Sequence, residues 1–512
     1  MASTERLLPF PRRAEIDGAT APSPEALVIM DILLTHGYFI SEDPHEQKVM
    51  KPYPPLGVLY ISSYLKSRGF SVDIHDTTFS SKEETQRYIE QARPAIVGIY
   101  TNLMTKLNVL PMIKWCKSVG AQVVLGGPEP PYYAENFLDA GADVVVIGEG
   151  EQTLEELIPA LQKGGSKWLH GIAGIIFRDE EGKTVRNPVR PQLKNLDELP
   201  FPDRGAIDLG KYLDTWRTHH GRSCVSIITA RGCPYTCKWC SHSVYGNTHR
   251  RRSPENVIAE LEEIVEHYNP DQLWYADDVL TIHRSWFLKF AGMVVERGLA
   301  RPFECISRAD RLDPEVITAL AKIKCSRLWI GSESGSQRVL DGMNRRTKVE
   351  DVQDKVHMLR DAGIETGMFI MLGYEGEEIS DLEATVDHLK KSNPDVFLTT
   401  VAYPIKGTPY YNEVESRVIE AIPWHERTDR DLTVAGRRSK RFYGFATRWM
   451  VNEVAVHKLS HDRRGGVRKL GKLAKAYINA RIGRTGMRLT QRELETSPAG
   501  RGQIHIENIA GR

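Results

Sequence analysis

The sequence predicts an α/β protein made of two parallel-sheet units in succession and a mostly helical C-terminal region. Three observations support this fold class. Short apolar runs alternate with helical segments over residues 25–160, the alternation starts again over residues 223–412, and within residues 413–512 the stretch 424–448 mixes aromatic side chains with many charges and runs into a helical segment. Strands that alternate with helices pair in parallel. We therefore expect a doubly wound, Rossmann-like N-terminal domain, a connector over residues 161–222, a (β/α)6 partial TIM barrel and a helical end.

The bulk composition is that of a globular protein with sizeable cores. The chain has 512 residues, enough for about three domains. Hydrophobic residues make up 41% and charged residues 26% of it, so apolar cores and a polar surface are both available. The formal net charge of +1 argues against binding through bulk charge to nucleic acid, and we expect no nucleic-acid partner.

Cysteine usage and the absence of long apolar runs indicate a cytoplasmic protein. Three of the seven cysteines stand in one short loop, which does not fit a disulfide framework in a chain of this length. Free thiols favour a reducing compartment. The first 24 residues contain no apolar segment typical of a secretory signal, and no run approaches the length of a membrane span.

The N-terminal domain is predicted from five short apolar strands with helices between them. The strands fall at residues 26–34, 71–74, 96–100, 122–125 and 144–147, and the helices at 56–67, 81–92, 109–119, 134–140 and 152–162. Doubly wound sheets bind ligands beyond the carboxyl ends of their strands. The candidate binding residues in those loops are Thr77, Thr101, Asn102, Gly126, Gly127, Pro128, Gly148 and Glu149. The glycines would let a large planar ligand approach the backbone, which fits a nucleotide, flavin or cobalamin, or the domain is a scaffold.

The connector is predicted to be structural. An apolar strand at residues 171–177 runs into a turn at 178–182, which is typical of a small β-hairpin. The prolines in residues 195–202 disfavour a helix and favour an extended tether.

The partial barrel is predicted from six strands. They fall at residues 225–230, 272–276, 302–306, 327–331, 365–372 and 396–403. The clearest helix between them begins at Ser253, an N-cap residue followed by Pro254 and by Glu255 in the first turn. We expect the chemistry at the carboxyl ends of these strands, as in full barrels.

The strongest chemical motif follows the first barrel strand. Residues 231–240 read R-G-C-P-Y-T-C-K-W-C and place Cys233, Cys237 and Cys240 in a C-x3-C-x2-C spacing. Three thiolates this close in sequence are suited to hold one iron–sulfur cube, and three ligands leave the fourth iron open. The alternatives are three unrelated buried cysteines, or a zinc loop that lacks its fourth ligand.

This motif resembles that of the radical S-adenosylmethionine (SAM) superfamily, in which SAM chelates the open iron. The phrases P-P-L-G, G-G-P-E and I-G-E-G-E at residues 54–57, 126–129 and 147–151 come before it, and this order resembles the cobalamin-dependent radical SAM enzymes. The cobalamin-binding phrase D-x-H-x-x-G is absent, because Thr78 stands where its glycine is required. We therefore expect His75 to be a loop or packing residue rather than a cobalt ligand.

The resemblance implies a [4Fe–4S] cluster, SAM and cobalamin as cofactors, and it assigns further site residues. Asp277 and Asp278 correspond to the position that helps to hold the SAM amino group, although an acid pair there could also cap a helix. Arg308 is suited to the SAM carboxylate, or it makes an ordinary surface ion pair. The remaining candidates are Tyr235 within the motif, and Glu333 and Ser334 in a segment like the family's ribose-binding one.

The function implied by the resemblance is carbon methylation through a 5′-deoxyadenosyl radical, with a flavodoxin- or ferredoxin-type electron donor. The substrate is expected to be a small molecule, a lipid or a peptide. One alternative is an oxidative cyclisation or rearrangement, as in the anaerobic magnesium-protoporphyrin ester cyclase, which has the same domain order. Another is a cobalamin and iron–sulfur sensor module without turnover, and a third is modification of RNA.

The C-terminal region is predicted to be helical and basic. A helix at residues 445–459 could form a cap over the barrel mouth. Residues 463–488 contain nine Lys or Arg and no acid, with apolar residues at near-helical spacing. A solvated face, or a dock for an acidic partner, is the first interpretation of such a stretch. A basic amphipathic helix also fits peripheral contact with an anionic membrane, or contact with a nucleic acid.

Overall fold

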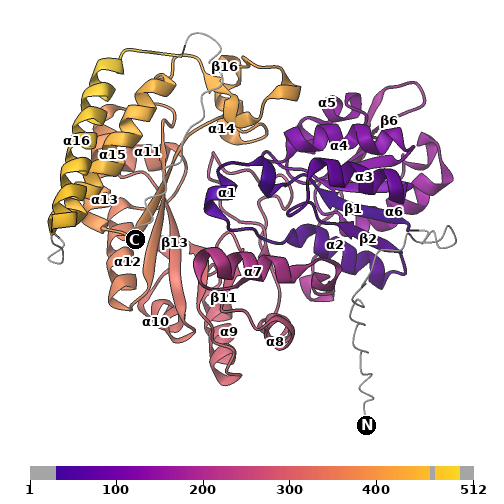
Figure 1. The fold of residues 1–512 in the computed structure, drawn as a ribbon, viewed down its shortest axis with the longest axis horizontal. Helices are drawn as coiled ribbons and strands as arrows, with labels where there is room; N and C mark the ends of the chain where they lie inside the picture. The colour runs from indigo at the N-terminus through magenta and orange to yellow at the C-terminus, as the bar shows by residue number, and fades with distance from the viewer. Residues whose placement is uncertain (1–29, 462–466, 496–512) are drawn as a thin grey trace.

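Two α/β units lie side by side in a computed structural model that describes residues 30–461 and 467–495 (Figure 1). The N-terminal unit, drawn in indigo and violet, carries the first sheet. The second unit, drawn in pink and orange, carries a second sheet, and a long helical hairpin in yellow lies on its far side. No helix within the described ranges is long and apolar enough to cross a bilayer.

The N-terminal sheet has seven strands in the order β2-β1-β3-β4-β5-β6-β7. Its first five strands run parallel and are β1 Ile32–His36, β2 Val72–His75, β3 Ile96–Tyr100, β4 Gln122–Gly126 and β5 Val144–Val146. This order confirms the predicted doubly wound sheet, whose chain reverses direction next to β1 and β3. Carboxyl ends of neighbouring strands therefore meet at one edge, where the ligand site was expected.

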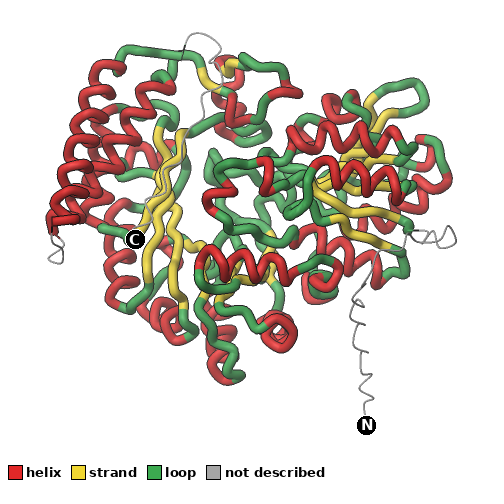
Figure 2. Tube along the Cα trace, viewed as in Figure 1, coloured by secondary structure: helices red, strands yellow, loops and turns green. Residues whose placement is uncertain are grey.

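Helices cover both faces of this sheet (Figure 2). On one face α2 Leu56–Ser67 packs against α6 Glu151–Lys163. The other face is covered by α3 Lys82–Ala92, α4 Lys106–Ser118 and α5 Ala134–Asp139. Separate apolar clusters fill the two faces, which is why the central strands are apolar along their whole length.

The first strand of the sheet differs from the expectation, whereas His75 agrees with it. Strand β1 begins at Ile32 and reaches His36, which pairs with Tyr100 in β3, and the buried Thr35 hydroxyl also donates to the carbonyl of His75 in β2. Residues 26–29 of the expected first strand lie outside the described residues. His75 is a packing residue, with its ring stacked on Tyr88 at 4.4 Å between centroids.

The connector begins as part of the first sheet. Strands β6 Ile175–Arg178 and β7 Thr184–Arg186 form the expected hairpin, and β6 pairs antiparallel with β5. The prolines that follow allow only short 3-10 turns, Leu196–Glu198 and Arg204–Ala206, before α7 Leu209–His220 packs on the second sheet.

The second sheet has six parallel strands in the order β15-β14-β13-β12-β11-β8. These strands are β8 Cys224–Ile227, β11 Gln272–Tyr275, β12 Phe303–Ser307, β13 Cys325–Glu333, β14 Glu365–Leu372 and β15 Val396–Val401. The helices are α8 Pro254–Tyr268, α9 Arg284–Glu296, α10 Pro314–Lys322, α11 Gln337–Gly342, α12 Val349–Asp361 and α13 Ile379–Ser392. The unbroken strand order confirms the predicted (β/α)6 partial barrel, open between its two edge strands.

The C-terminal region ends in a helical hairpin. It follows α14 Pro409–Val414 and the strand pair β16 Val418–Ile419 and β17 Thr433–Val434. The hairpin helices are α15 Lys440–His461 and α16 Val467–Thr490. Helix α15 packs along α13, on the side of the barrel away from the N-terminal unit, so the expectation of a helical cap over the mouth is wrong (Figure 1). The physical reason is the apolar face of α15, which is buried in the core of the barrel.

Candidate functional site

A cavity of about 390 Å³ lies at the carboxyl edge of the N-terminal sheet. Its walls are mostly apolar, a feature typical of sites for large organic ligands. The first unit supplies most of the lining, including residues 54–58, Gly126, Gly127, Pro128, Gly148 and Glu149. The second unit closes the cavity with Ile228, Arg231, Val244 and Tyr245. The cavity therefore exists only where the two units meet.

Glycines make the floor of this cavity flat. Gly127 has φ +108°, and a Cβ there would lie 2.3 Å from the carbonyl oxygen of Thr101. An added Cβ at Gly57 or Gly126 would meet nothing within 4 Å, although both residues line the cavity. A planar ring system can thus reach the backbone at several points. The residues present fit a cobalamin.

Three of the expected cobalamin-binding residues lie outside the cavity and stabilise the chain around it. The Thr77 hydroxyl is buried and donates to the carbonyl of His36 at 2.8 Å. The side-chain oxygen of Asn102 accepts from the backbone N–H groups of Met104 and Thr105 at the start of α4. The third residue, Thr101, is fully buried beneath Gly127. Their side chains stabilise the loops, and none of the three lines the cavity.

Glu149 lines the cavity, and its carboxylate binds the second unit. One oxygen lies 2.7 Å from Arg231, and the other accepts from Arg250 at 2.8 Å and from the backbone N–H of Leu193 at 3.0 Å. Arg231 also lies 2.6 Å from Glu151, and all of these side chains except that of Arg250 are at least nine-tenths buried. The guanidinium of Arg231 thus joins the loop after β5 to the cysteine motif. Sequence reasoning missed this role, because the partners are about 80 residues apart.

The cysteine loop is closed at its base by a two-stranded ladder. Strands β9 Ala230–Arg231 and β10 Arg250–Arg251 pair antiparallel on either side of it. Gly232 has φ +83°, and a Cβ there would lie 2.3 Å from the carbonyl oxygen of Thr248. The loop is also held by Lys238, whose N–H donates to Met343 and whose carbonyl accepts from Tyr410. These contacts fix the loop at the carboxyl end of the barrel.

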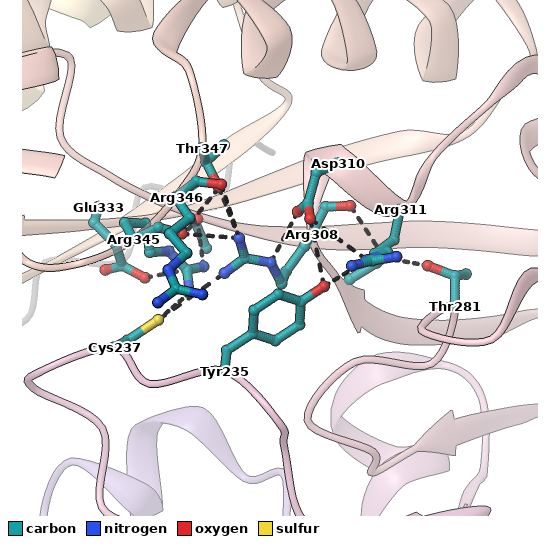
Figure 3. A network of polar contacts seen from close by, with 12 residues as sticks. Tyr235, Cys237, Thr281, Arg308, Asp310, Arg311, Glu333, Arg345, Arg346 and Thr347 are labelled. Carbon is teal, nitrogen blue, oxygen red and sulfur yellow. Dashed lines mark hydrogen bonds and ion pairs between the residues drawn. The ribbon is translucent and has the colours of Figure 1, made fainter. Parts of the chain in front are cut away.

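The three cysteines offer a suitable donor set for an iron–sulfur cube. A hydrogen bond from Cys240 and the charge of Arg345 lower the pKa of the Cys237 thiol to about 5 despite its burial. The Arg345 guanidinium lies 3.4 Å from the Cys237 sulfur (Figure 3). Within the described residues, no three His, Cys, Asp or Glu side chains surround a single metal position. A cube needs no such convergence, because each thiolate binds a different iron.

An aromatic and guanidinium network with the buried Arg308 at its centre lies beside Cys237 (Figure 3). Arg308 lies 3.8 Å from the centre of the Tyr235 ring and donates to Asp310 and Thr347. Its side chain is 2% exposed, so it makes no surface ion pair. The Tyr235 hydroxyl accepts from Arg311 at 2.5 Å. Because Arg308 already has these partners, a SAM carboxylate would have to displace one of them to bind it.

The two adjacent aspartates behave differently. Asp277 is buried and accepts from the backbone N–H groups of Thr229 and Ala230 and from Arg251. Asp278 is exposed and lines a second cavity, of about 210 Å³. The protein atoms around the Asp278 carboxylate and the charge of Asp277 raise the pKa of Asp278, although its side chain reaches solvent. Only Asp278 has a carboxylate available for a ligand.

Glu333 and Ser334 lie at the end of β13, as the sequence predicts. Glu333 has φ +64°, and its carboxylate lies 3.6 Å from Arg345. Burial raises the pKa of Glu333, and the charge of Arg345 opposes the rise. The Ser334 hydroxyl is fully buried 3.2 Å from that of Thr385 in α13, so it orders the loop.

The second cavity adjoins the first. It is lined by Gly232, Ser241, His242 and Asp278, beside the cysteine loop. The Nε2 atom of His242 is buried and has no hydrogen-bond partner in the described part of the chain. Four residues line both cavities: Pro128, Ile228, Val244 and Tyr245. A ligand in one cavity is thus separated from a ligand in the other by little more than these side chains.

Known proteins match both units in the same order. Residues 47–158 match the B12 binding domain, and residues 227–389 match the radical SAM superfamily. An uncharacterized methyltransferase of Pyrococcus horikoshii is 28% identical over 74% of this chain and 82% of its own. The anaerobic magnesium-protoporphyrin IX monomethyl ester cyclase of Rubrivivax gelatinosus is 27% identical over 72% of this chain and 67% of its own.

A solved structure shares the arrangement of both units. The cobalamin-dependent S-adenosylmethionine radical enzyme OxsB, with aqua-cobalamin and S-adenosylmethionine bound, superposes with a TM-score of 0.68. The match covers 90% of this chain and 72% of that chain at 18% sequence identity, so the likeness shows the fold alone.

Proposed function

The chain belongs to the cobalamin-dependent radical SAM enzymes, and we propose that it transfers a methyl group to an unactivated carbon of an organic substrate. Its two domains imply a [4Fe–4S] cluster, SAM and cobalamin as cofactors. The proposal rests on one observation above all: the cavity of the first unit and the cavity beside the cysteine loop share a wall. Two cofactors held there would face the same small volume.

Each cofactor has residues that would hold it. Cys233, Cys237 and Cys240 would hold the cluster, and Asp278 would accept a hydrogen bond from the SAM amino group. The floor at Gly126 and Gly127 would lie against the cobalamin ring. When bound, the cluster and SAM supply a radical that removes hydrogen from carbon, and cobalamin supplies the methyl group.

The chain's own contribution is position and exclusion of water. The walls between the two cavities are mainly apolar, and a site closed to solvent protects a reactive organic radical from side reactions. Arg231 keeps the cysteine loop at a fixed place relative to the first sheet. The proposed substrate is a small molecule, a lipid or a peptide, and a flavodoxin- or ferredoxin-type protein would deliver the electron.

Radical oxidative cyclisation is the second candidate, because the relatives include magnesium-protoporphyrin ester cyclases. The two reactions consume SAM differently. Methyl transfer uses one SAM for the radical and a second for the methyl group, so it yields 5′-deoxyadenosine and S-adenosylhomocysteine together. Cyclisation yields no S-adenosylhomocysteine.

The test uses full-length protein, purified without oxygen after expression with cobalamin. Iron, sulfide and cobalt are quantified, and the reduced enzyme is then given methyl-labelled SAM and candidate substrates. Label in the product together with S-adenosylhomocysteine supports methyl transfer. A cluster without bound cobalamin removes methyl transfer through cobalt. Failure to cleave SAM with both cofactors in place would leave only a binding or sensor module.

A further inference from the structure

The last helix of the described chain, α16, has one face fixed against its neighbour. Its inward side packs on α15 through small residues. A Cβ added to Gly483 would lie 2.5 Å from the backbone nitrogen of Trp449, and one added to Gly486 would overlap the ring of Phe445. Ala476, Ala480 and Met487 are buried on the same side. Because the two helices approach so closely, the opposite face of α16 is held outward (Figure 1).

That outward face is apolar where a surface helix is normally polar. Of the twelve large apolar side chains that stand exposed in the described part of the chain, five lie on α16. They are Leu470 (65% exposed), Tyr477 (51%), Ile478 (57%), Ile482 (42%) and Leu489 (79%). Successive members are one, four or seven residues apart, which places all five along one side of the helix. Exposed apolar residues gathered in this way mark an interaction surface.

The same helix is strongly basic. It carries seven Lys or Arg and no acid, and the neighbouring α15 carries four against a single Glu453, which pairs with Lys390. On α16, Arg484 pairs with Glu383. Lys472, Lys475, Arg481 and Arg488 are exposed, and none of them pairs with an acid within the described ranges. By the 3.6-residue period, Arg481 and Arg488 lie among the exposed apolar side chains and Lys475 lies at the edge of their face.

We propose that α16 docks the enzyme on an anionic lipid bilayer, lying in the plane of the surface. An interfacial helix needs an apolar face with Lys and Arg beside it, and this is the arrangement found. At 24 residues the helix is about 36 Å long, so its side chains would meet many headgroups at once. The apolar side chains would enter the headgroup boundary, while the cations would meet lipid phosphates.

A lipid surface fits these residues better than the other occupants of such a face. A nucleic acid would pair with the cations and leave Ile478, Ile482 and Leu489 facing water. A second copy of this helix would place cation against cation. Only an anionic, partly apolar surface satisfies both kinds of side chain.

The test measures sedimentation of the cofactor-loaded, full-length enzyme with vesicles of phosphatidylcholine, with or without phosphatidylglycerol. We expect binding to the anionic vesicles, little binding to the neutral ones, and weaker binding as salt is raised. The double variant Ile478→Glu/Ile482→Glu and the double variant Lys472→Glu/Lys475→Glu should each lower the partition coefficient at least about tenfold. Val295→Glu, at an equally exposed apolar position on α9, should leave it unchanged.

The thermal midpoint and cofactor content of each variant show whether it is folded, since all the substituted side chains are exposed. Absence of binding between the wild-type enzyme and anionic vesicles would overturn the proposal, as would equal binding to neutral and anionic vesicles. Salt-sensitive binding to RNA without binding to vesicles would assign the surface to nucleic acid. A dimer that dissociates in Ile478→Glu/Ile482→Glu, with no vesicle binding, would assign it to a second copy.

Discussion

The guanidinium of Arg231 lies 2.7 Å from the carboxylate of Glu149, although the first belongs to the cysteine loop and the second to the loop after β5. Both side chains are 6% exposed, and Glu151 takes the other end of the same guanidinium. A buried ion pair of this kind fixes geometry more than it adds stability, because desolvation offsets much of the attraction. Its loss, however, leaves charges buried alone.

Replacing this arginine should therefore destabilise the contact between the units. We expect Arg231→Met to lower the free energy of unfolding by about 3 kcal/mol, since Glu151 is left without its cation. The variant should also lose cobalamin on gel filtration, because Arg231 lines the cavity. Arg178→Met removes an exposed pair with Asp139 and should shift the melting temperature little. Equal shifts for the two variants would contradict the role given to Arg231.

Each motif cysteine should be needed for SAM cleavage. We expect Cys233→Ala, Cys237→Ala and Cys240→Ala to lose bound iron and to form no 5′-deoxyadenosine after reduction, because a cube held by two thiolates is not retained. Cys116→Ala changes a buried thiol in α4 and should keep both. Retained cleavage in any of the three motif variants would refute the cluster assignment.

The floor of the larger cavity can be tested with a pair of glycines. Gly127→Ala should raise the dissociation constant for cobalamin about tenfold or more, because the new Cβ must move the Thr101 carbonyl. Gly120→Ala is the matched control, since Gly120 also has a positive φ, +85°, but has nothing within 4 Å of a Cβ. Each substitution costs about 1 kcal/mol of backbone strain. If Gly120→Ala weakens cobalamin binding equally, strain alone is responsible.

Substitution of one aspartate should affect SAM binding, and substitution of its neighbour should affect protein stability. Asp278→Asn should raise the KM for SAM about tenfold, as expected for one lost charge-assisted hydrogen bond, and should leave the melting temperature unchanged. Asp277→Asn should lower the free energy of unfolding by about 2 kcal/mol, because the buried Arg251 loses its partner. Thermal melts and SAM titrations distinguish the two outcomes. The opposite pattern would transfer the SAM role to Asp277.

His388 should make stability depend on pH. Burial, and then the charge of Lys391, lower the pKa of His388 to about 4. The unfolded chain therefore takes up the proton first, and the contribution of His388 is complete above pH 6.5 and is lost as the pH falls toward 4. It amounts to about 3 kcal/mol at most.

A variant isolates this effect from other titrating groups. The difference in unfolding free energy between wild type and His388→Gln should shrink as the pH falls from 6.5 to 4, because an amide does not titrate. Gln353 donates to Nδ1 of His388, so Nε2–H donates to Ser332, and the amide of glutamine can replace that bond. His267→Gln, on the exposed side of α8, should follow the wild-type curve. Parallel curves for His388→Gln and wild type would disprove the assignment.

The strands were predictable because parallel strands are buried on both faces and appear as unbroken apolar runs. Strand β14 was predicted to the residue, and the alternation with helices predicted that neighbouring strands of both sheets pair in parallel. Pairings between distant segments were not predictable in this way. Nothing local in residues 175–178 says that they extend the first sheet beside β5.

The site was predictable where one short stretch carries it. The cysteines and the glycines of the larger cavity are local patterns, and they were found from sequence. The contacts of Cys237 with Arg345 and of Arg231 with Glu149 join residues 108 and 82 positions apart, so no window of sequence contains them. Adjacent residues such as Asp277 and Asp278 have side chains in different surroundings, and this difference appears only in the folded structure.

Half of the wall shared by the two cavities, Val244 and Tyr245, comes from an irregular segment, residues 241–246, rather than from a strand. Loops tolerate substitution and changes of length far better than the buried strands that they connect. Part of the wall between the two cavities therefore lies in a segment that is free to vary. During divergence, substitutions in this short segment could change the substrate while the cysteines, the glycine floor and the Arg231 contacts stay the same.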